Sequence, residues 1–545
     1  MRAQQNRISA PIDRSRTVLL KGNVHPGAQA QYDRGPVEPS FELASVTLLL
    51  KPSPSQQAAL EQLLDQQQDP SSPHYHQWLT PEQYAERFGL SPGDIAAVVS
   101  WLRSEGLQVN DVARGRRWIA FTGTAGLIDS AFRTAIHRYN VEGETHFAAA
   151  SEPSIPAALA GVVDGFQGLD DFYPKPMRRM APAGDPAYNS SSGAHYLAPD
   201  DFATIYNLNP LYAAGFDGAG QKIAIIGDSD IDLADVQHFR RRFNLPANDP
   251  QVVLYGPDPG MNSDNLGEAD LDLEWSGAVA PNATIVYVYA KSVNTASQYA
   301  IDQNLAPVIS FSFGGCEPSN SAAFRSVAQQ ASAQGITWLA ASGDFGAATC
   351  EARGSLQASR GLAVSFPASI PEITAVGGTM FNEGGGSYWA AANGPNLGSA
   401  LSYIPETAWN ETGASGLASS GGGASVLFSK PLWQTGPGVP DDNARDVPDV
   451  ALSAAGHDGY LVVSGGVNWI FSGTSAASPA FAGIVALLNQ NQAQPGLGNI
   501  NPALYRLAQS TANVFHDITT GDNVVPCKVN SPNCRNGSMG YQAGP

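Results

Sequence analysis

Lys222-Ile-Ala-Ile-Ile-Gly227 is the first of several short apolar segments that decide the fold of the larger part of this 545-residue chain. Similar segments follow at Thr284-Ile-Val-Tyr-Val-Tyr289, Pro307-Val-Ile-Ser-Phe-Ser-Phe313, Ile336-Thr-Trp-Leu-Ala-Ala-Ser342 and Ile373-Thr-Ala-Val-Gly377, with helix-length stretches between them. Strands that are apolar on both faces are typical of a mostly parallel sheet with helices on both sides. We therefore predict an α/β domain over residues 195–545, with ligands at the carboxyl ends of its strands.

The amino-terminal part of the chain has a more mixed pattern. A strand-like run at Leu43–Leu50 precedes a helical stretch at Ser55–Gln68. A second helix begins at Ser91, a strand follows at Arg117–Phe121, and a third helix covers Leu127–Ala135. This order is close to a split βαβ sandwich. We predict an amino-terminal extension over residues 1–35 and an α+β, ferredoxin-like domain over residues 36–174.

Residues 175–194 separate the two predicted domains. They are rich in Pro, Gly and Ser and show neither helical nor strand periodicity, which indicates a linker. An exposed basic linker is also a favourable place for a proteolytic cut.

Charge and hydropathy exclude several classes of function. The chain carries 30 Lys and Arg against 49 Asp and Glu, a net charge of -19, which argues against binding to nucleic acid or to an anionic membrane. No apolar run reaches the length of about 18 residues that a membrane span needs. The chain begins without the apolar core of a signal peptide; we expect a start further upstream and a secreted protein. An acidic composition suits work in acid, although ordinary solubility explains it equally well.

The chain has four cysteines, and their spacing does not fit a zinc site. Cys527 and Cys534 close a short loop, and Cys316 and Cys350 each follow the end of a predicted strand. We predict disulfides between Cys316 and Cys350 and between Cys527 and Cys534, in an oxidising compartment. Buried free thiols are the alternative.

Ser475 is the candidate nucleophile. The segment Phe471-Ser-Gly-Thr-Ser-Ala-Ala-Ser-Pro479 leads directly into an apolar helix, so Ser475 lies near a helix start, where backbone N–H groups can hold an oxyanion. A serine there is also a common helix cap. None of the nine histidines lies in a His-Gly-Thr-His context, so a base other than histidine is needed.

Carboxylates at helical spacing provide candidates for that base. In Gly267-Glu-Ala-Asp-Leu-Asp-Leu-Glu274, Glu268 and Asp272 lie side by side on one face, and Asp270 and Glu274 on another. The apolar stripe of this helix lies nearer to Glu268 and Asp272, so we expect that pair to be the more buried one and its pKa to be raised. A solvated acidic face is the alternative.

Asp344 follows a predicted strand end in the turn Ser342-Gly-Asp-Phe-Gly346. Its commoner use would be to fix the turn. A protonated carboxyl at this position would instead donate a hydrogen bond to an oxyanion, which requires low pH.

These segments together resemble the signature of the sedolisin family of serine-carboxyl peptidases, in order and in spacing. Asp69-Pro-Ser-Ser-Pro-His-Tyr-His-Gln-Trp-Leu-Thr-Pro-Glu-Gln83 resembles the hallmark of that family's pro-domain. The resemblance to kumamolisin-like precursors implies a subtilisin-like catalytic domain preceded by an activation pro-domain that acts as an intramolecular inhibitor. It also implies a monomeric, autoprocessed zymogen that hydrolyses peptides.

The resemblance assigns a role to each candidate residue. Ser475 is the nucleophile of an acyl-enzyme mechanism, Glu268 the general base and acid, Asp272 the residue that orients Glu268, and Asp344 the oxyanion donor. Kumamolisin-like members extend the carboxylate network by a Glu and a Trp, where this chain has Gly227 and Phe313; that extension is not expected here.

The family also implies one structural Ca²⁺ site near the end of the chain. Asp517 and the carbonyls of Ile518 and Gly544 are the matching oxygens. Calcium prefers six to eight oxygen ligands, and the family's second carboxylate is missing from this sequence, so we expect an incomplete site.

Three alternatives to an acid endopeptidase remain. A tripeptidyl aminopeptidase of the same family would release short products. A homologue without activity would act as a binding or inhibitory module, and a Ser/His/Asp protease would need the missing His motif.

Overall fold

The computed structural model describes residues 4–182, 195–319 and 322–544, which form two compact units. Unit 1 consists of Met1–Tyr173 together with Ile301–Asn304 and Ser319–Gln334, and unit 2 of the rest of the chain from Pro174. The predicted linker therefore divides: its first part, residues 175–182, belongs to unit 2, and residues 183–194 lie outside the described residues.

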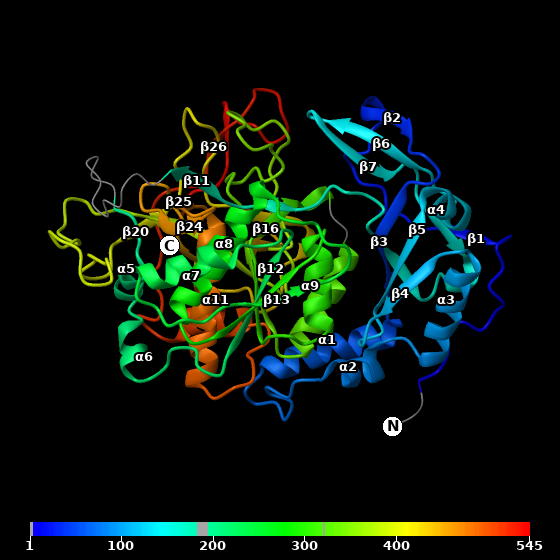
Figure 1. The fold of residues 1–545 in the computed structure, drawn as a ribbon, viewed down its shortest axis with the longest axis horizontal. Helices are drawn as coiled ribbons and strands as arrows, with labels where there is room; N and C mark the ends of the chain where they lie inside the picture. The colour runs from blue at the N-terminus through cyan, green and yellow to red at the C-terminus, as the bar shows by residue number, and fades with distance from the viewer. Residues whose placement is uncertain (1–3, 183–194, 320–321, 545) are drawn as a thin grey trace. The chain divides into compact units, whose positions relative to one another are not determined.

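Unit 1 is built on a four-stranded antiparallel sheet in the order β4-β5-β3-β9 (Figure 1). The strands are β3 (Glu42–Leu50), β4 (Gln108–Val112), β5 (Trp118–Thr124) and β9 (Val163–Gln167). Helices α1 (Pro54–Gln68), α2 (Pro81–Phe88) and α3 (Pro92–Ser104) connect β3 to β4, and α4 (Ala125–Phe132) follows β5. This is the predicted α+β arrangement.

Unit 1 also contains elements that the sequence patterns do not predict: α2 and the sheet of β2 (Asp33–Pro36), β6 (Ile136–Val141) and β7 (Glu144–Ala149). A reciprocal cap between Thr80 and Gln83 begins α2, and this pattern of Thr followed three residues later by Gln is a known helix-start signal. Thr80 and Gln83 lie within the Asp69–Gln83 segment that resembles the hallmark of the family's pro-domain.

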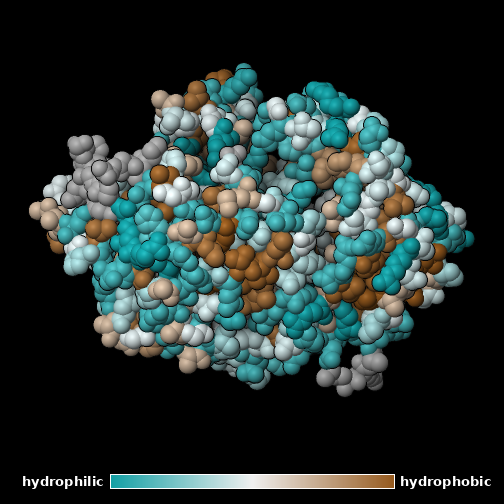
Figure 2. All heavy atoms as spheres, viewed as in Figure 1, coloured by the Kyte–Doolittle hydropathy of each residue, from teal (hydrophilic) through white to brown (hydrophobic). Residues whose placement is uncertain are grey.

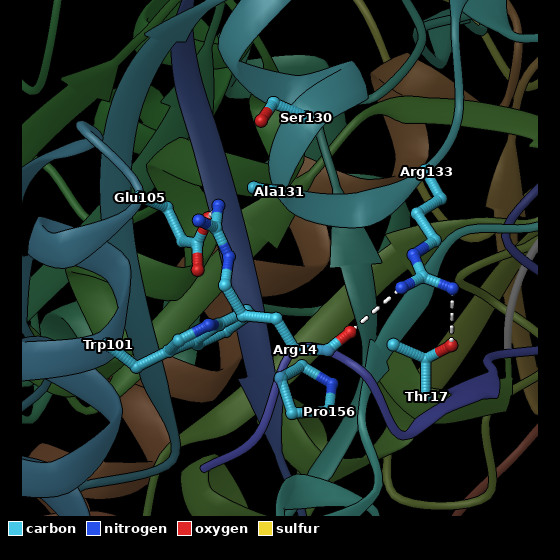
Figure 3. Close-up of a pocket in the computed structure, with 8 residues that line it drawn as sticks. All are labelled: Arg14, Thr17, Trp101, Glu105, Ser130, Ala131, Arg133 and Pro156. Atoms are coloured by element: carbon cyan, nitrogen blue, oxygen red, sulfur yellow. Dashed lines mark hydrogen bonds and ion pairs between the residues drawn. The ribbon is translucent and has the colours of Figure 1, made fainter.

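The amino-terminal segment takes part in the fold of unit 1. Strand β1 (Thr17–Leu19) pairs with β8 (Ser154–Pro156), and Arg133 donates hydrogen bonds to the Thr17 hydroxyl at 3.1 Å and to the Arg14 carbonyl at 2.8 Å (Figure 3). Arg14 also forms an ion pair with Glu105. These side chains line a small polar pocket, whose contacts fix the segment to α3 and α4.

Unit 2 contains the predicted, mostly parallel sheet, with strand order β13-β14-β12-β15-β17-β19-β20 and β23 paired to β19. Its parallel strands are β12 (Lys222–Gly227), β13 (Gln251–Leu254), β14 (Thr284–Tyr289), β15 (Val308–Phe311), β17 (Thr337–Ala341), β19 (Thr374–Phe381) and β23 (Val450–Ser453). β20 (Glu406–Ala408) joins this sheet antiparallel, beside β19. The apolar runs in the sequence thus predicted the centre of the sheet.

Two long helices of unit 2 position the residues of interest. Helices α8 (Ser263–Val279) and α11 (Thr474–Asn491) pack against each other, and α11 also lies along β15, β17 and β19 (Figure 1). Their close approach depends on Gly483, because a Cβ there would lie 2.5 Å from the Cβ of Val279. Helix α7 (Leu233–Arg242) and strand β24 (Tyr460–Ser464) cover the other side of α8.

Both predicted disulfides are present. Cys316 is bonded to Cys350 and Cys527 to Cys534, so the structure contains no free cysteine among the described residues. None of the helices that the structure describes is both long and apolar enough to cross a membrane. The face shown in Figure 2 is mainly hydrophilic, with apolar side chains in separate patches.

Candidate active site

Ser475 lies in the first turn of α11 and is fully buried. Strand β25 (Val467–Ser472) leads into the helix through Gly473, whose φ of 110° suits a glycine. A Cβ on Gly473 would lie 2.3 Å from Asp344 Oδ2 and 2.8 Å from the Met177 carbonyl oxygen. The Ser475 hydroxyl does not cap the helix; it donates to the Ser312 carbonyl at 3.0 Å.

All four carboxylates of the predicted helix are buried in α8. Glu268, Asp270 and Asp272 are fully buried, and Glu274 is 1% exposed. The alternative of a solvated acidic face is therefore wrong, and so is the expectation that Glu268 and Asp272 would be the more buried pair, because Asp270 and Glu274 are buried to the same extent. The apolar stripe could not reveal that α7 and β24 cover the opposite face of this helix.

The pair Glu268 and Asp272 faces the serine. Ser312, between β15 and β16 (Phe313–Cys316), donates from its hydroxyl to Asp272 Oδ1 at 2.7 Å and accepts from Ser475 through its carbonyl. Glu268 Oε2 lies 3.0 Å from Nε of Arg178, and both side chains are buried. Ser312 thus links the candidate nucleophile to the carboxylate pair.

Burial raises the pKa of Glu268 to about 7, while the Arg178 charge and the Ser475 hydroxyl oppose that rise and Asp344 adds to it. Burial, followed by the Glu268 charge, also raises the pKa of Asp272 well above its usual value. Because like charges at this spacing disfavour double ionisation, the two carboxyl groups tend to retain a proton between them.

Asp344 lies in the turn after β17, directly beside the start of α11. Its Oδ1 accepts from the backbone N–H of Thr474 at 2.8 Å and from the Thr474 hydroxyl at 3.0 Å. Burial raises its pKa to about 7, against the effects of these hydrogen bonds and of the Arg179 and Arg353 charges. Oδ2 has no hydrogen-bond partner within the part of the chain that the structure describes, so a protonated Asp344 has a free donor beside Ser475.

The beginning of the predicted linker runs through this site as an extended chain. Strand β10 (Lys175–Pro176) pairs antiparallel with β16, and β11 (Arg179–Pro182) pairs antiparallel with β25. Between them, the Met177 N–H donates to the Ser312 carbonyl at 3.0 Å, and the Met177 carbonyl accepts from the Ser475 N–H at 2.9 Å. Three residues of this site, Met177, Arg178 and Ser312, are not predicted by the sequence patterns.

The sequence offered a signal only for Ser312. It follows directly on the carboxyl end of an apolar strand, where ligands of parallel sheets collect. Met177 and Arg178 lie in an extended segment, and nothing in its composition indicates which of its residues reaches the serine.

Gly227 and Phe313 stand where kumamolisin-like members extend the carboxylate network with a Glu and a Trp. Gly227 ends β12 against the Tyr287 hydroxyl, which a Cβ would approach within 2.1 Å. Phe313 is buried in β16 beside Phe311.

The residues predicted to hold calcium lie in two irregular segments near the end of the chain. Asp517 and Gly544 are exposed, and Ile518 lies in the same irregular segment as Asp517. No group of three or more His, Cys, Asp or Glu side chains placed to hold a metal ion occurs among the described residues. One carboxylate and two carbonyls do not provide the six to eight oxygens that calcium prefers.

Comparison with known proteins agrees with this geometry. Residues 29–172 match the family described as Pro-kumamolisin, activation domain, and residues 260–519 match the subtilase family. Kumamolisin from Bacillus sp. (strain MN-32) is 31% identical, over 97% of this chain and 92% of that protein. Sedolisin from Pseudomonas sp. (strain 101) is 31% identical, over 94% of this chain and 86% of its own. The chain belongs to the sedolisin family of serine-carboxyl peptidases.

Comparison with solved structures and with a further relative supports the same family. The solved Pseudomonas sedolisin, a serine-carboxyl proteinase complexed with pseudo-iodotyrostatin, superposes with a TM-score of 0.54 at 30% identity, covering 64% of this chain and 92% of that one. Human tripeptidyl-peptidase 1 is 30% identical over 89% of this chain and 86% of its own. This member of the sedolisin family is thus a peptidase with a subtilisin-like α/β domain and an amino-terminal activation domain, as expected for a zymogen.

Proposed function

We propose that this sedolisin-family peptidase is a secreted zymogen that cleaves internal peptide bonds at acidic pH through an acyl-enzyme on Ser475. The observation that carries the proposal is the 2.9 Å hydrogen bond from the Ser475 N–H to a peptide carbonyl, that of Met177. A peptide carbonyl held beside a serine hydroxyl and buried carboxyl groups is the arrangement that acyl transfer requires.

In the proposed mechanism, Ser475 Oγ attacks the carbonyl carbon of the bound peptide, and Glu268 accepts the hydroxyl proton as general base. This step requires the hydroxyl to leave the Ser312 carbonyl and turn towards Glu268, which Asp272 orients. Glu268 then gives the proton to the leaving amine. Water activated through Glu268 hydrolyses the ester on Ser475 and restores the free enzyme.

Asp344 makes the reaction depend on acid. Its O–H and the Ser475 N–H together stabilise the oxyanion of the tetrahedral intermediate, and only the protonated carboxyl can donate. Since the pKa of Asp344 is raised to about 7 by burial, its donor is present below that pH and is lost as the pH rises through it. Glu268 must be ionised at the same time, and the mutual repulsion of the two groups favours one proton shared between them.

The course of the bound segment supports an endopeptidase over a tripeptidyl peptidase. Residues of unit 2 continue on both sides of Met177, with β10 before it and β11 after it, each paired to a strand of the site. A site that binds chain on both sides of the attacked carbonyl accepts internal peptide bonds. Product lengths from a long unfolded substrate test this: a range of internal fragments is expected, and a ladder of tripeptides would contradict it.

A matched pair of serine variants tests the assignment of the nucleophile. Ser475→Ala removes the nucleophile, whereas Ser478→Ala removes an equally buried hydroxyl on the same helix, one that lies 3.1 Å from the Ser310 hydroxyl. Hydrolysis of an unfolded protein at acidic pH should fall at least about a thousandfold in the first variant and only slightly in the second. Normal turnover by Ser475→Ala would refute the proposal.

We also propose that the Ca²⁺ site formed by Asp517, Ile518 and Gly544 binds calcium weakly at best. Calcium binding to the folded state raises the melting temperature in proportion to the logarithm of its concentration over Kd. Titration of the Ser475→Ala protein with calcium should therefore give little or no rise. A large rise at low calcium would contradict this.

The two disulfides support secretion, because such bonds persist in oxidising compartments. Expression with an export signal should give oxidised, foldable protein, whereas expression in a reducing compartment should lower the yield. The proposed monomer should show a mass near 57.1 kDa by light scattering before processing.

A further inference from the structure

The linker residue Met177 has the backbone contacts of a substrate residue. Its N–H donates to the Ser312 carbonyl and its carbonyl accepts from the Ser475 N–H. Arg353, which does not belong to this segment, adds two contacts: its Nη2 donates to the carbonyl of Pro176 at 3.0 Å and to that of Arg178 at 3.2 Å. The chain is thus held on both sides of Met177, with that residue's carbonyl at the nucleophile.

The side chain of Met177 occupies an enclosed place in the same site. Only 4% of it is exposed. It lies against the bare Cα of Gly314 in β16: a Cβ on that glycine would come within 2.5 Å of Met177 Cε and 2.3 Å of the Ser365 hydroxyl. Gly314 therefore provides the space that a long unbranched side chain needs at this position.

Arg178 occupies the next position with equally specific contacts. Its Nε lies 3.0 Å from Glu268 Oε2, and its guanidinium lies over the Phe471 ring, 5.1 Å from the centroid. Gly267 leaves room for it, since a Cβ there would lie 3.2 Å from Nη2 of Arg178. Each of the two residues therefore has a formed subsite, one on either side of the peptide bond that joins them.

We propose that the bond between Met177 and Arg178 is the first that this peptidase cuts in its own chain, with Met177 in the subsite at Gly314 and Arg178 in the subsite of Phe471 and Glu268. This inference rests on the proposed function and specifies its first substrate. The sequence had placed the cut only within residues 175–194, and residues 183–194 lie outside the described residues.

The chemistry of the cut balances without any added reactant except water. Ser475 Oγ forms a bond to the Met177 carbonyl carbon, and the bond from that carbon to the Arg178 nitrogen breaks. The serine proton passes through Glu268 to the Arg178 nitrogen, which becomes the new amino terminus. Water then cleaves the ester, leaving a carboxylate on Met177 and the hydroxyl on Ser475.

The same contacts define what the mature enzyme should prefer in other substrates. A pocket bounded by Gly314 and Ser365 favours methionine or another long unbranched apolar side chain before the cut bond. Removing one methylene group from such a side chain lowers kcat/KM by about ten- to two-hundredfold. Peptides with the sequence of residues 173–182 are therefore expected to be cut after methionine.

The test follows the full-length chain after transfer from neutral to acidic buffer. N-terminal sequencing and intact-mass analysis should find Arg178 as the first new amino terminus and a pro-fragment that ends at Met177. An active enzyme whose first cut lies at another bond would overturn the inference and leave the proposed function intact. A chain that neither processes itself nor hydrolyses an unfolded protein would overturn both.

Variants of two methionines test the subsite. Met177→Ala should slow the first cut by about tenfold or more, whereas Met261→Ala, outside this segment and 55% exposed, should leave its rate nearly unchanged. Equal slowing by both variants would overturn the assignment of Met177. Because Met177→Ala removes a buried side chain, the comparison is repeated with synthetic peptides of residues 173–182 and the mature enzyme, where folding of the variant plays no part.

Discussion

The two carboxylate pairs of α8 lie on one helix, are equally buried and differ only in what they face. Glu268 and Asp272 face Ser312, Ser475 and Arg178, whereas Glu274 accepts from the Val463 N–H of β24 at 3.0 Å. Burial raises the pKa of all four well above the usual range of carboxyl groups or, for Glu268, to about 7. A buried carboxyl with a raised pKa is therefore not by itself a sign of catalysis in this protein.

The difference between the pairs is the presence of a nucleophile. Asp270 and Glu274 are surrounded by α7 and β24, and the charge of Asp235 raises both of their pKa values further. Asp235 itself accepts from the N–H groups of Gly465 and Gly466. These groups hold the end of β24 and α7 beside α8, which is a structural task. The serine that acts on the pKa of Asp270 is Ser464, which ends β24 and does not lie at a helix start as Ser475 does.

The largest expected effect is on kcat, and it distinguishes the carboxylate pair of Glu268 and Asp272 from that of Asp270 and Glu274. Glu268→Gln keeps the shape of the side chain but removes the base, and it should lower kcat by about a hundred- to ten-thousandfold. Glu274→Gln removes a carboxylate of the same helix and the same burial, and it should change kcat by only a few-fold. Initial rates on an unfolded protein at acidic pH measure both. Similar losses in the two variants would show that burial in α8, and not the position beside Ser475, accounts for the effect.

Asp344 allows a second comparison, between two replacements of one residue. Asp344→Ala removes the oxyanion donor and should lower kcat by about a hundred- to a thousandfold. Asp344→Asn retains a neutral donor that does not titrate, so it should lose much less and keep its activity as the pH rises through about 7, where the wild type declines. Full pH–rate profiles decide this. If the activity of the Asn variant falls with rising pH as that of the wild type does, a group other than Asp344 controls the loss of activity above about pH 7.

The ion pair of Arg178 predicts an effect on maturation. While Arg178 holds Glu268 as a carboxylate, the Ser475 hydroxyl donates to the Ser312 carbonyl, so the base is restrained. Asp272, Asp344 and Arg353 also face Glu268, and of these Arg353 likewise favours its ionised form. The Arg178→Gln variant should therefore cut its own chain faster than the wild type, by up to about tenfold. The gain in rate should be greatest near neutral pH, where Glu268 is most ionised.

Arg179→Gln is the control for the Arg178 variant. It removes the same charge one residue further on, from a guanidinium that donates to the Leu417 carbonyl and that acts on the pKa of Asp344 but not on that of Glu268. The appearance of the mature band over time, measured at several pH values, compares the two. Faster processing in both variants would assign the effect to the charge of the segment, and slower processing in Arg178→Gln would show that Arg178 assists the cut.

The sequence predicted the sheet and the place of each candidate residue because those signals are local. Apolar runs mark β12, β14, β15 and β17, and the elements carrying Ser475, Glu268 and Asp344 meet where the strands of a parallel sheet end. The burial of Asp270 and Glu274 was not predictable, because a helical wheel shows only the apolar stripe of α8 and not the elements that cover its other side. The role of Met177 was hidden for a similar reason: an extended segment takes its register from the strands it pairs with.

The smallest expected effect concerns stability and returns to Glu274. The folded protein raises the pKa of this carboxyl above its ordinary value of 4.5, mainly through burial. Above that ordinary value the unfolded chain loses the proton while the folded chain keeps it, so the folded state binds more protons and its stability falls as the pH rises. Below this ordinary pKa value both states are protonated, and the carboxyl has no effect on stability.

Glu274→Gln should therefore raise the melting temperature at neutral pH and leave it unchanged in strong acid. Calorimetry in the Ser475→Ala background, which avoids self-digestion, measures this, with Glu61→Gln at an exposed position of α1 as control. A gain that is equal at both pH values would mean that Gln improves packing, and that the protonation of Glu274 does not limit the stability of α8.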